Sequence, residues 1–300
     1  LSLFALAPFP KGMILDLFPD EDGDTVEEWL TDSLVHLSLV QDNRDGWYEI
    51  HPLLRRYFRD KLEASPHAEP AKRRYCEIMS KKSAEMPQNL TVEIVEEFKP
   101  FLLHLQTSVG EYPQYIADED LFWSYTGLAR YYNGQGLYAI AEPYYQACLT
   151  ATRTHLGDNH PDVATSLNNL AALYDSQGRY TEAEPLYLEA LDLRKRLLGD
   201  NHPDVAQSLN NLAYLYNSQG RYTEAEPLYL EALDLLKRLL GDNHPNTKTC
   251  RNNLQRLRQQ QKPTSLTWWQ WIIVIPIVIL WMPFYLLWML TRWLVRRFIR

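Results

Sequence analysis

The stretch HPDVATSLNNLAALYDSQGRYTEAEPLYLEALDLRKRLLGDN at 160–201 recurs at 202–243 with four substitutions. The substituted pairs are Thr165/Gln207, Ala172/Tyr214, Asp175/Asn217 and Arg194/Leu236. A weaker copy precedes the two units at 118–159, and a partial copy follows from His244, so the period is 42 residues. A fixed period of this length is typical of solenoids, in which each unit packs only on its neighbours.

Each unit predicts two helices joined by a tight turn. Leu167, Leu170, Ala171 and Tyr174 recur at helical spacing and form one apolar stripe. Gly178 then interrupts the helical pattern. A second stripe follows, made by Ala183, Leu186, Tyr187, Ala190 and Leu191.

These positions resemble the tetratricopeptide repeat. That family's order of Leu, small residue, Tyr, Gly, Tyr, Ala, aromatic and Ala is matched in the second unit by Leu170, Ala171, Tyr174, Gly178, Tyr180, Ala183, Tyr187 and Ala190. The 42-residue spacing and the strings LNNLA and LGDNHPDVA are most similar to kinesin light chain repeats. The resemblance covers 118–262 and implies a helical solenoid that binds another protein.

The partial copy after the third repeat predicts the end of the solenoid. Arg251, Gln255 and Arg258 stand where the second repeat has its apolar stripe, and a stacked array needs a terminal helix with a polar outer face. We therefore predict a mainly α-helical chain with these segments: a winged-helix-like domain (1–63), a helical connector or degenerate repeat (64–117), three repeats (118–159, 160–201 and 202–243), a capping helix (244–262), a transmembrane or re-entrant helix (268–291) and a basic tail (292–300).

The first 63 residues lie outside the repeat. Their pattern predicts two helices, a β-hairpin around the turn at Asn43–Gly46, and a third helix that begins at His51-Pro52. The expected ranges are about 11–18 and 25–39 for the first two helices, and 37–41 and 47–50 for the strands.

This order resembles the winged-helix region of NB-ARC/STAND signalling ATPases. His51 matches the histidine of that family's Met-His-Asp motif, whereas Ile50 and Pro52 replace the Met and Asp. The resemblance implies that His51 senses the nucleotide state; the alternative is a histidine packed at a strand–helix junction. No G-x-x-x-x-G-K-[ST] motif is present, so a nucleotide-binding domain of such a protein would lie upstream of Leu1.

An uncharged run of 29 residues extends from Pro263 to Thr291 and contains WWQWIIVIPIVILWMPFYLLWML. About 20 apolar residues suffice to cross a bilayer, and tryptophan favours the membrane interface. We expect one kinked span or a re-entrant segment, with the protein anchored at the membrane and its repeats in the cytoplasm.

Composition argues against several other classes. The formal net charge is −8 and the basic residues are scattered until the C-terminus, which disfavours nucleic acid as a partner. Cys76, Cys148 and Cys250 are too far apart in the sequence to indicate a disulfide framework or a C-x-x-C zinc site. No catalytic constellation stands out, so we expect no enzymatic activity, no cofactor and no metal. Carboxylates such as Glu182 and Glu184 are expected to be solvated.

In tetratricopeptide repeats the first helix of each pair lines the concave face, which makes its intervening polar residues candidates for a peptide-binding groove. An Asn side chain both donates and accepts, so a ladder of Asn169, Asn211 and Asn253 would bond the main chain of an extended peptide. Two alternatives remain open: the asparagines came along with a duplication, or the first Asn of each pair makes an inter-repeat hydrogen bond. The candidate groove residues are Asn168, Asn169, Asn210, Asn211, Asn252, Asn253, Tyr214, Arg130 and Arg256.

Charge and loop position suggest two further roles. Arg130 and Arg256 favour an acidic ligand. His160, His202 and His244 precede a proline in each inter-repeat loop, which predicts helix caps rather than a metal ladder.

The sequence thus predicts a membrane-anchored scaffold or sensor, part of a signalling protein, that binds a protein or peptide. The first alternative is the sensor portion of an NB-ARC-type ATP-dependent switch. The second is an effector whose C-terminal segment perturbs the membrane.

Overall fold

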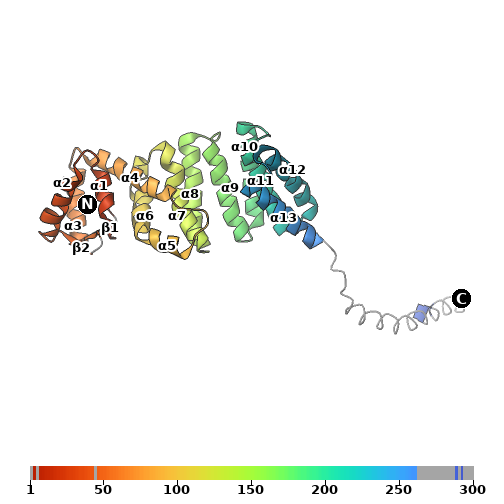
Figure 1. Cartoon of the computed structure of the whole chain (residues 1–300), viewed down its shortest axis with the longest axis horizontal. Helices are drawn as coiled ribbons and strands as arrows, with labels where there is room; N and C mark the ends of the chain where they lie inside the picture. Colours follow the sequence, from red (N-terminus) through yellow and green to blue (C-terminus); the bar gives the residue numbers. More distant parts are fainter. Residues whose placement is uncertain (1–2, 5–6, 44–45, 262–287, 290–291, 293–300) are drawn as a thin grey trace. The chain divides into compact units, whose positions relative to one another are not determined.

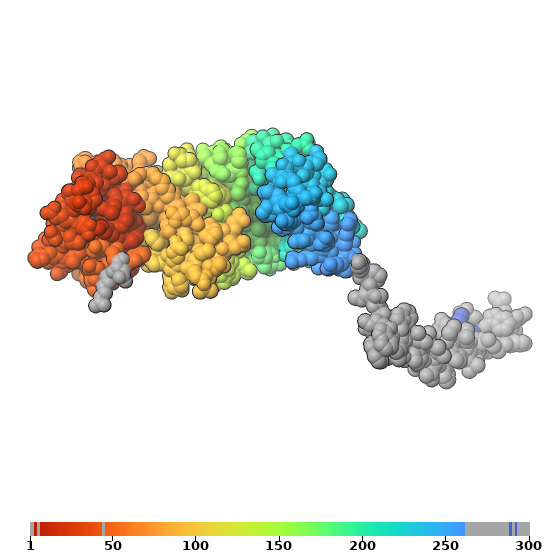
Figure 2. Space-filling view, in the orientation of Figure 1, coloured from red at the N-terminus to blue at the C-terminus, as the bar shows by residue number. Residues whose placement is uncertain are grey.

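The computed structural model describes residues 3–4, 7–43, 46–261, 288–289 and 292. The chain divides into two units, Leu1–Asn253 and Leu254–Arg300. Within the first unit, helical pairs follow one another in sequence order (Figure 1). The surface of this unit also follows the sequence colours (Figure 2), so adjoining patches come from neighbouring segments, as a solenoid requires.

Each of the three repeats forms the two helices that its apolar stripes predict. Leu167, Ala171 and Ala183 are fully buried where the two helices of the second repeat meet. The first half of the final helix packs on the third repeat, where the Cys250 thiol donates to the Tyr229 carbonyl at 3.5 Å. The helices are α7 (Leu121–Gly134), α8 (Tyr138–Leu156), α9 (Pro161–Ser176), α10 (Tyr180–Leu198), α11 (Pro203–Ser218), α12 (Tyr222–Leu240) and α13 (Pro245–Gln261).

The loop histidines cap the first helix of a unit. In His160, His202 and His244 the imidazole Nδ1 accepts from the backbone N–H two residues on, at 3.2, 3.1 and 3.2 Å. The following proline occupies the first helical position, where its missing N–H costs least. The capping prediction is therefore confirmed.

The N-terminal segment has the predicted order of helices and hairpin strands with shifted boundaries, but a strand that was not predicted, β1, adds a third strand to the sheet. The sheet order is β1-β3-β2, with antiparallel pairing of Val40 to Ile50 and of Phe9 to Tyr48. The elements are β1 (Phe9–Pro10), α1 (Lys11–Leu17), α2 (Gly23–Glu28), the π-helical η1 (Trp29–Val35), β2 (Val40–Asp42), β3 (Trp47–Ile50) and α3 (Pro52–Glu63).

Two predictions for this segment were wrong in detail. The helix expected at 25–39 is split into α2 and η1, and the first hairpin strand starts at Val40 rather than at 37. Ser38 closes the helical stretch, because its φ of 56° is left-handed and its N–H bonds to the Val35 carbonyl at 2.8 Å. The strand can begin only after this closure.

A connector of short helices leads into the first repeat. Its longest helix, α4, packs on α7 in the way that α8 packs on α9. Ser83 Oγ donates to the Trp123 carbonyl at 2.7 Å across this contact, so α4 takes the place of the second helix of a preceding pair. The elements are α4 (Ala68–Ala84), α5 (Val92–Phe98), η2 (Lys99–Phe101), α6 (Leu102–Glu111), η3 (Pro113–Tyr115) and η4 (Asp118–Asp120).

One hydrophobic core joins the N-terminal segment, the connector and the first repeat. Phe4 stacks on Phe9 with ring centroids 4.1 Å apart, and Tyr75 meets Phe4 edge-on. Leu128 of α7 belongs to the same cluster. The expected boundary between 1–63 and 64–117 is thus a change of local structure within a shared core.

Among the described residues, no helix is both long enough and apolar enough to cross a membrane. The predicted membrane helix at 268–291 falls almost wholly outside those residues.

Candidate peptide-binding groove

An open cavity of about 590 Å³ lies across the first helices of successive repeats. Helices α7, α9, α11 and the start of α13 line it, joined by single residues from α8, α10 and the α4–α5 loop. The lining residues are Gln88, Arg130, Asn133, Tyr145, Thr165, Asn168, Asn169, Ala172, Arg194, Gln207, Asn211, Asn246 and Thr249. The hollow has polar walls, and four of the predicted groove residues line it: Arg130, Asn168, Asn169 and Asn211.

The substitutions between the two near-identical repeats concentrate in this groove. Thr165 and Gln207 both line it, and so does Ala172, whose sequence equivalent Tyr214 has a side chain that is 47% exposed. Arg194 also reaches the lining. The fourth pair, Asp175/Asn217, has no member in the lining, and at all other positions the two units are identical. Three of the four differences therefore involve the groove lining.

Sequence reasoning did not assign Arg194 to the groove. Its position on the second helix of the pair pointed away from the concave face, but its guanidinium is buried and donates to Ser208 Oγ at 2.9 Å and to the Asp204 carbonyl at 3.1 Å. The sequence did offer one sign that Arg194 is special, because the equivalent residue in the third repeat is Leu236.

The paired asparagines bond to one another between repeats. Asn211 Nδ2 donates to Asn168 Oδ1 at 2.8 Å, and Asn253 Nδ2 donates to Asn210 Oδ1 at 3.2 Å. Gln207 Nε2 adds a bond to Asn211 Oδ1 at 2.8 Å. The inter-repeat alternative therefore describes these side chains, and any bond from Asn211 to a peptide has to compete with bonds that it already makes. Their role in peptide binding stays a prediction.

Asn169 stands at the open end of this ladder. Its Nδ2 is buried and has no hydrogen-bond partner within the described residues. In the preceding repeat, the position equivalent to the acceptor Asn168 is Thr126, so no asparagine is there to accept a hydrogen bond from Asn169. The Thr126 hydroxyl lies 3.5 Å from Cys148 Sγ. Asn169 is consequently a ladder member whose donor is left over in the groove wall.

The other predicted groove residues occupy different environments. Arg130 lines the groove, with its guanidinium 5.5 Å from the Trp123 ring and an N–H donated to the Met86 carbonyl at 3.2 Å. Burial lowers the pKa of Arg130 from its ordinary value. Asn252 is exposed on α13. Arg256 is an exposed residue of the second unit, and its place in the groove stays a prediction.

His51 lies at the start of α3 and is exposed. Its Nδ1 accepts from the Leu53 N–H at 3.3 Å, the same cap that the histidines of the repeats form. It thus sits at a strand–helix junction between β3 and α3, and a nucleotide-sensing role stays a prediction.

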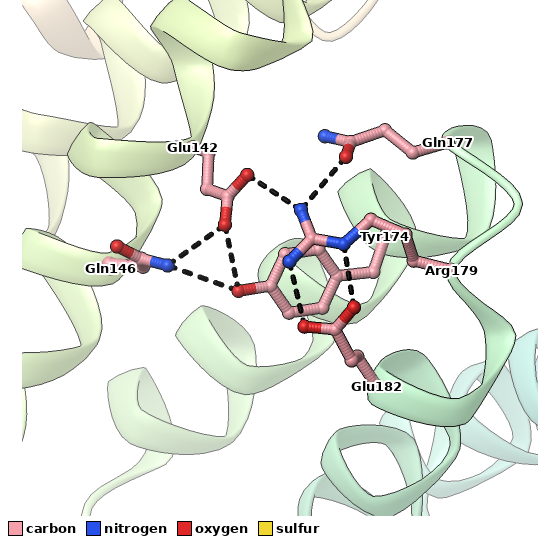
Figure 3. A network of polar contacts seen from close by, with 6 residues as sticks. All are labelled: Glu142, Gln146, Tyr174, Gln177, Arg179 and Glu182. Carbon is pink, nitrogen blue, oxygen red and sulfur yellow. Dashed lines mark hydrogen bonds and ion pairs between the residues drawn. The ribbon is translucent and has the colours of Figure 1, made fainter.

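A network of polar contacts fixes the register of the repeats and so shapes the groove (Figure 3). Arg179 donates to Glu142 of the preceding repeat and to Glu182 of its own, each at 2.7 Å. Its guanidinium stacks on the Tyr174 ring at 4.1 Å, and the Tyr174 hydroxyl donates to Glu142 at 3.2 Å.

The same network recurs 42 residues later. Arg221 donates to Glu184 and Glu224 at 2.7 Å and stacks on Tyr216 at 4.0 Å. The Tyr216 hydroxyl donates to Glu184 at 3.0 Å. Glu182 is exposed, as expected, but is also paired with Arg179, whereas Glu184 is only partly exposed and pairs with Arg221 of the next repeat.

The class of protein follows from this fold and groove. A family model for the tetratricopeptide repeat matches residues 121–162, 163–204 and 205–246. These ranges keep the 42-residue period and begin three residues after the predicted boundaries. The central prediction, a solenoid of three tetratricopeptide repeats, is confirmed.

A comparison with solved structures finds similar chains, among them the following three. A point variant of a Podosopora anserina putative kinesin light chain, with nearly identical TPR-like repeats, is 22% identical, with a TM-score of 0.50, and the match covers 66% of this chain and 91% of that one. A second structure of the P. anserina putative kinesin light chain is 21% identical, with a TM-score of 0.46, and the match covers 66% of this chain and 90% of that one. BtubC (BKLC) from P. vanneervenii is 21% identical, with a TM-score of 0.43, and the match covers 68% of this chain and 93% of that one. The first likeness supports the fold alone. A search of the curated proteins finds no match.

Proposed function

We propose that this protein is a membrane-anchored scaffold whose groove binds an extended segment of another protein. The observation that carries the proposal is the place of the repeat differences. The two units differ at four positions, and three of the four pairs have a member in the groove lining: Thr165/Gln207, Ala172/Tyr214 and Arg194/Leu236.

The shape and polarity of the groove fit a peptide better than a small molecule. Neighbouring helices pack about 8–10 Å apart, so three first helices span about 20 Å, the length of about six extended residues. Small-molecule sites are mostly apolar, whereas this lining is made largely of amide, hydroxyl and guanidinium side chains. Those groups suit the polar main chain of a peptide.

Tyr214→Ala tests the groove. Repeat two carries Ala172 at the equivalent place, so the change should preserve the fold. Peptides are selected from a random phage-displayed library on the full chain in detergent. We expect Tyr214→Ala to weaken their Kd about tenfold or more, because Tyr214 is the third-repeat equivalent of the groove-lining Ala172 and an exposed aromatic side chain at such a position is a typical binding hot spot. Fluorescence polarisation measures the Kd.

Leu230→Gln is the matched control. Leu230 is 44% exposed on α12 outside the groove lining, and the first repeat carries Gln146 there. This variant should bind as the unmodified chain does. Selected peptides that bind Tyr214→Ala with full affinity would refute the groove as the binding site.

The membrane part of the proposal rests on the uncharged run from Pro263 to Thr291. An arginine near the centre of such a segment costs about 2.5–3.5 kcal/mol on insertion scales. We expect the full chain to stay in the membrane pellet after carbonate extraction, and a chain with Ile275→Arg and Ile279→Arg to move to the supernatant. Recovery of both chains in the supernatant would refute anchoring. A second measurement tests the topology: if the repeats face the cytoplasm, protease should cleave them in inside-out vesicles.

A second candidate is the sensor portion of an ATP-dependent switch. The order of helices, hairpin and helix in 1–63 and the exposed His51 at the start of α3 support it. Sequencing the coding region upstream of Leu1 tests this candidate. A nucleotide-binding domain encoded there would support the switch, and a reading frame without one would refute it.

A further inference from the structure

Asp175 is an uncompensated carboxylate on the groove side of the second repeat. It lies on α9 three residues after Ala172, which lines the groove, and therefore on the same helix face. Its side chain is partly buried, and within the described residues it accepts no hydrogen bond and forms no ion pair. Burial alone raises the pKa of Asp175 to about 6.

The register of the repeats sets Tyr214 and Asn217 at nearly the level of Asp175 along the first helix of the next repeat. The bond between Asn168 and Asn211 ties α9 to α11. Asp175 is seven residues beyond one end of that bond, and Tyr214 and Asn217 are three and six residues beyond the other. At about 1.5 Å per residue, Asp175 and Asn217 lie at nearly the same level along equivalent helices, with Tyr214 one turn short of them.

The electrostatics of two buried tyrosines agree with this register. Asp175 and Tyr214 both act electrostatically to raise the pKa of Tyr187 and of Tyr229, in addition to the larger effect of burial. Asp175 and Tyr214 therefore both lie close enough to Tyr187 and to Tyr229 to affect their pKa.

The third repeat also carries unpaired polar atoms within the part of the chain that the structure describes. Asn217 Oδ1 is buried without a hydrogen-bond partner among the described residues, as is the Tyr229 hydroxyl. The equivalent of Asp175 in the third repeat is the neutral Asn217, so a side chain of nearly the same size without the charge is compatible with this fold. Burying a charge without a partner costs stability, and an ionisable group kept at such a cost is a candidate binding residue.

We propose that Asp175 and Tyr214 form a subsite for a positively charged side chain, a lysine or an arginine, of the peptide bound in the groove. This inference rests on the proposed function. The carboxylate supplies the counter-charge, and the exposed Tyr214 ring offers its face to the cation. A metal ion is not the expected occupant, because no group of three or more metal-ligating side chains converges within the described residues.

Asp175→Asn is the decisive variant. Peptides selected on the full chain are expected to share a lysine or an arginine, and recovery of either residue or of both supports the subsite and identifies the cation that fits. Asp175→Asn should weaken their Kd about tenfold, replacement of the shared basic residue by norleucine should do the same, and the two changes together should weaken it no further than either alone. The thermal midpoint of Asp175→Asn should equal or exceed that of the unmodified chain, because a buried charge is removed.

Asp192→Asn is the matched control, since it makes the same change of charge at an exposed residue of α10 and should leave the Kd unchanged. Two outcomes would overturn the subsite but not the proposed groove. In both, the peptides lose affinity with Tyr214→Ala, and they either share no basic residue or bind Asp175→Asn with unchanged Kd. Peptides that respond to neither variant, or a selection that enriches none, would overturn both.

Discussion

Gly127→Ala is expected to lower the free energy of unfolding by about 2–3 kcal/mol. A Cβ atom at Gly127 would lie 2.0 Å from Ser83 Oγ and 2.6 Å from the Ser83 backbone oxygen. The hydroxyl can rotate away, but the backbone oxygen belongs to α4 and moves only if α4 separates from α7. Urea unfolding followed by circular dichroism measures the change.

Gly110→Ala is the control for this substitution. Gly110 is an exposed glycine of α6, and nothing lies within 4 Å of a Cβ built on it. Because alanine is the better helix former, this change should be neutral or stabilise the chain by up to about 1 kcal/mol. If Gly127→Ala unfolds at the same urea concentration as Gly110→Ala, the close contact of α4 with α7 does not constrain the fold.

Acidification should destabilise the chain through His104. This residue of α6 is fully buried, and its Nε2 lies 3.0 Å from the Pro8 carbonyl. Burial lowers the pKa of His104 from 6.5 to about 4, with a smaller contribution from Arg55. The fold therefore favours the neutral ring. Its stabilising effect is complete above pH 6.5 and is lost as the pH falls toward 4, a loss of about 3 kcal/mol at 1.36 kcal/mol per pH unit.

The difference between the unmodified chain and His104→Gln isolates this effect, because the carboxylates titrate in both. Glutamine can still donate to the Pro8 carbonyl but gains no charge, so unfolding curves from pH 7 to pH 4 should show a shallower loss of stability in the variant. His36→Gln, at a position with more solvent exposure, should keep the full pH dependence. Equal slopes for His104→Gln and the unmodified chain would contradict the assignment.

The repeat architecture was readable from the sequence because its determinants are local. Apolar residues at helical spacing predict each helix, and Gly178, with a φ of 73°, ends one where a left-handed residue is needed. His160 and Pro161 start the next helix through a cap within two residues. Duplication made the signal unambiguous, since α9–α10 and α11–α12 carry nearly the same residues.

The groove was predicted in position and only partly in detail. The sequence places Asn168 and Asn211 on the concave face, but the bond between them depends on the rotation of one helix against the next. Arg194 escaped prediction for the same reason, because its guanidinium crosses from α10 to Ser208 of α11. Periodicity predicts which face of its own helix a side chain occupies, but it does not predict which residues of the neighbouring helix that side chain contacts.

By itself the sequence determined the period, the helical pairs, their caps and turns, and which positions the repeats allow to vary. The tertiary structure alone decided that the N-terminal segment shares one core with the first repeat through Phe4, Phe9 and Tyr75. It also decided that Arg179 bonds to Glu142 of the preceding repeat, and that Asp175 has no partner among the described residues. The reason is physical: helices and turns are selected by interactions over a few residues, whereas these contacts join side chains whose distance depends on how whole helices pack.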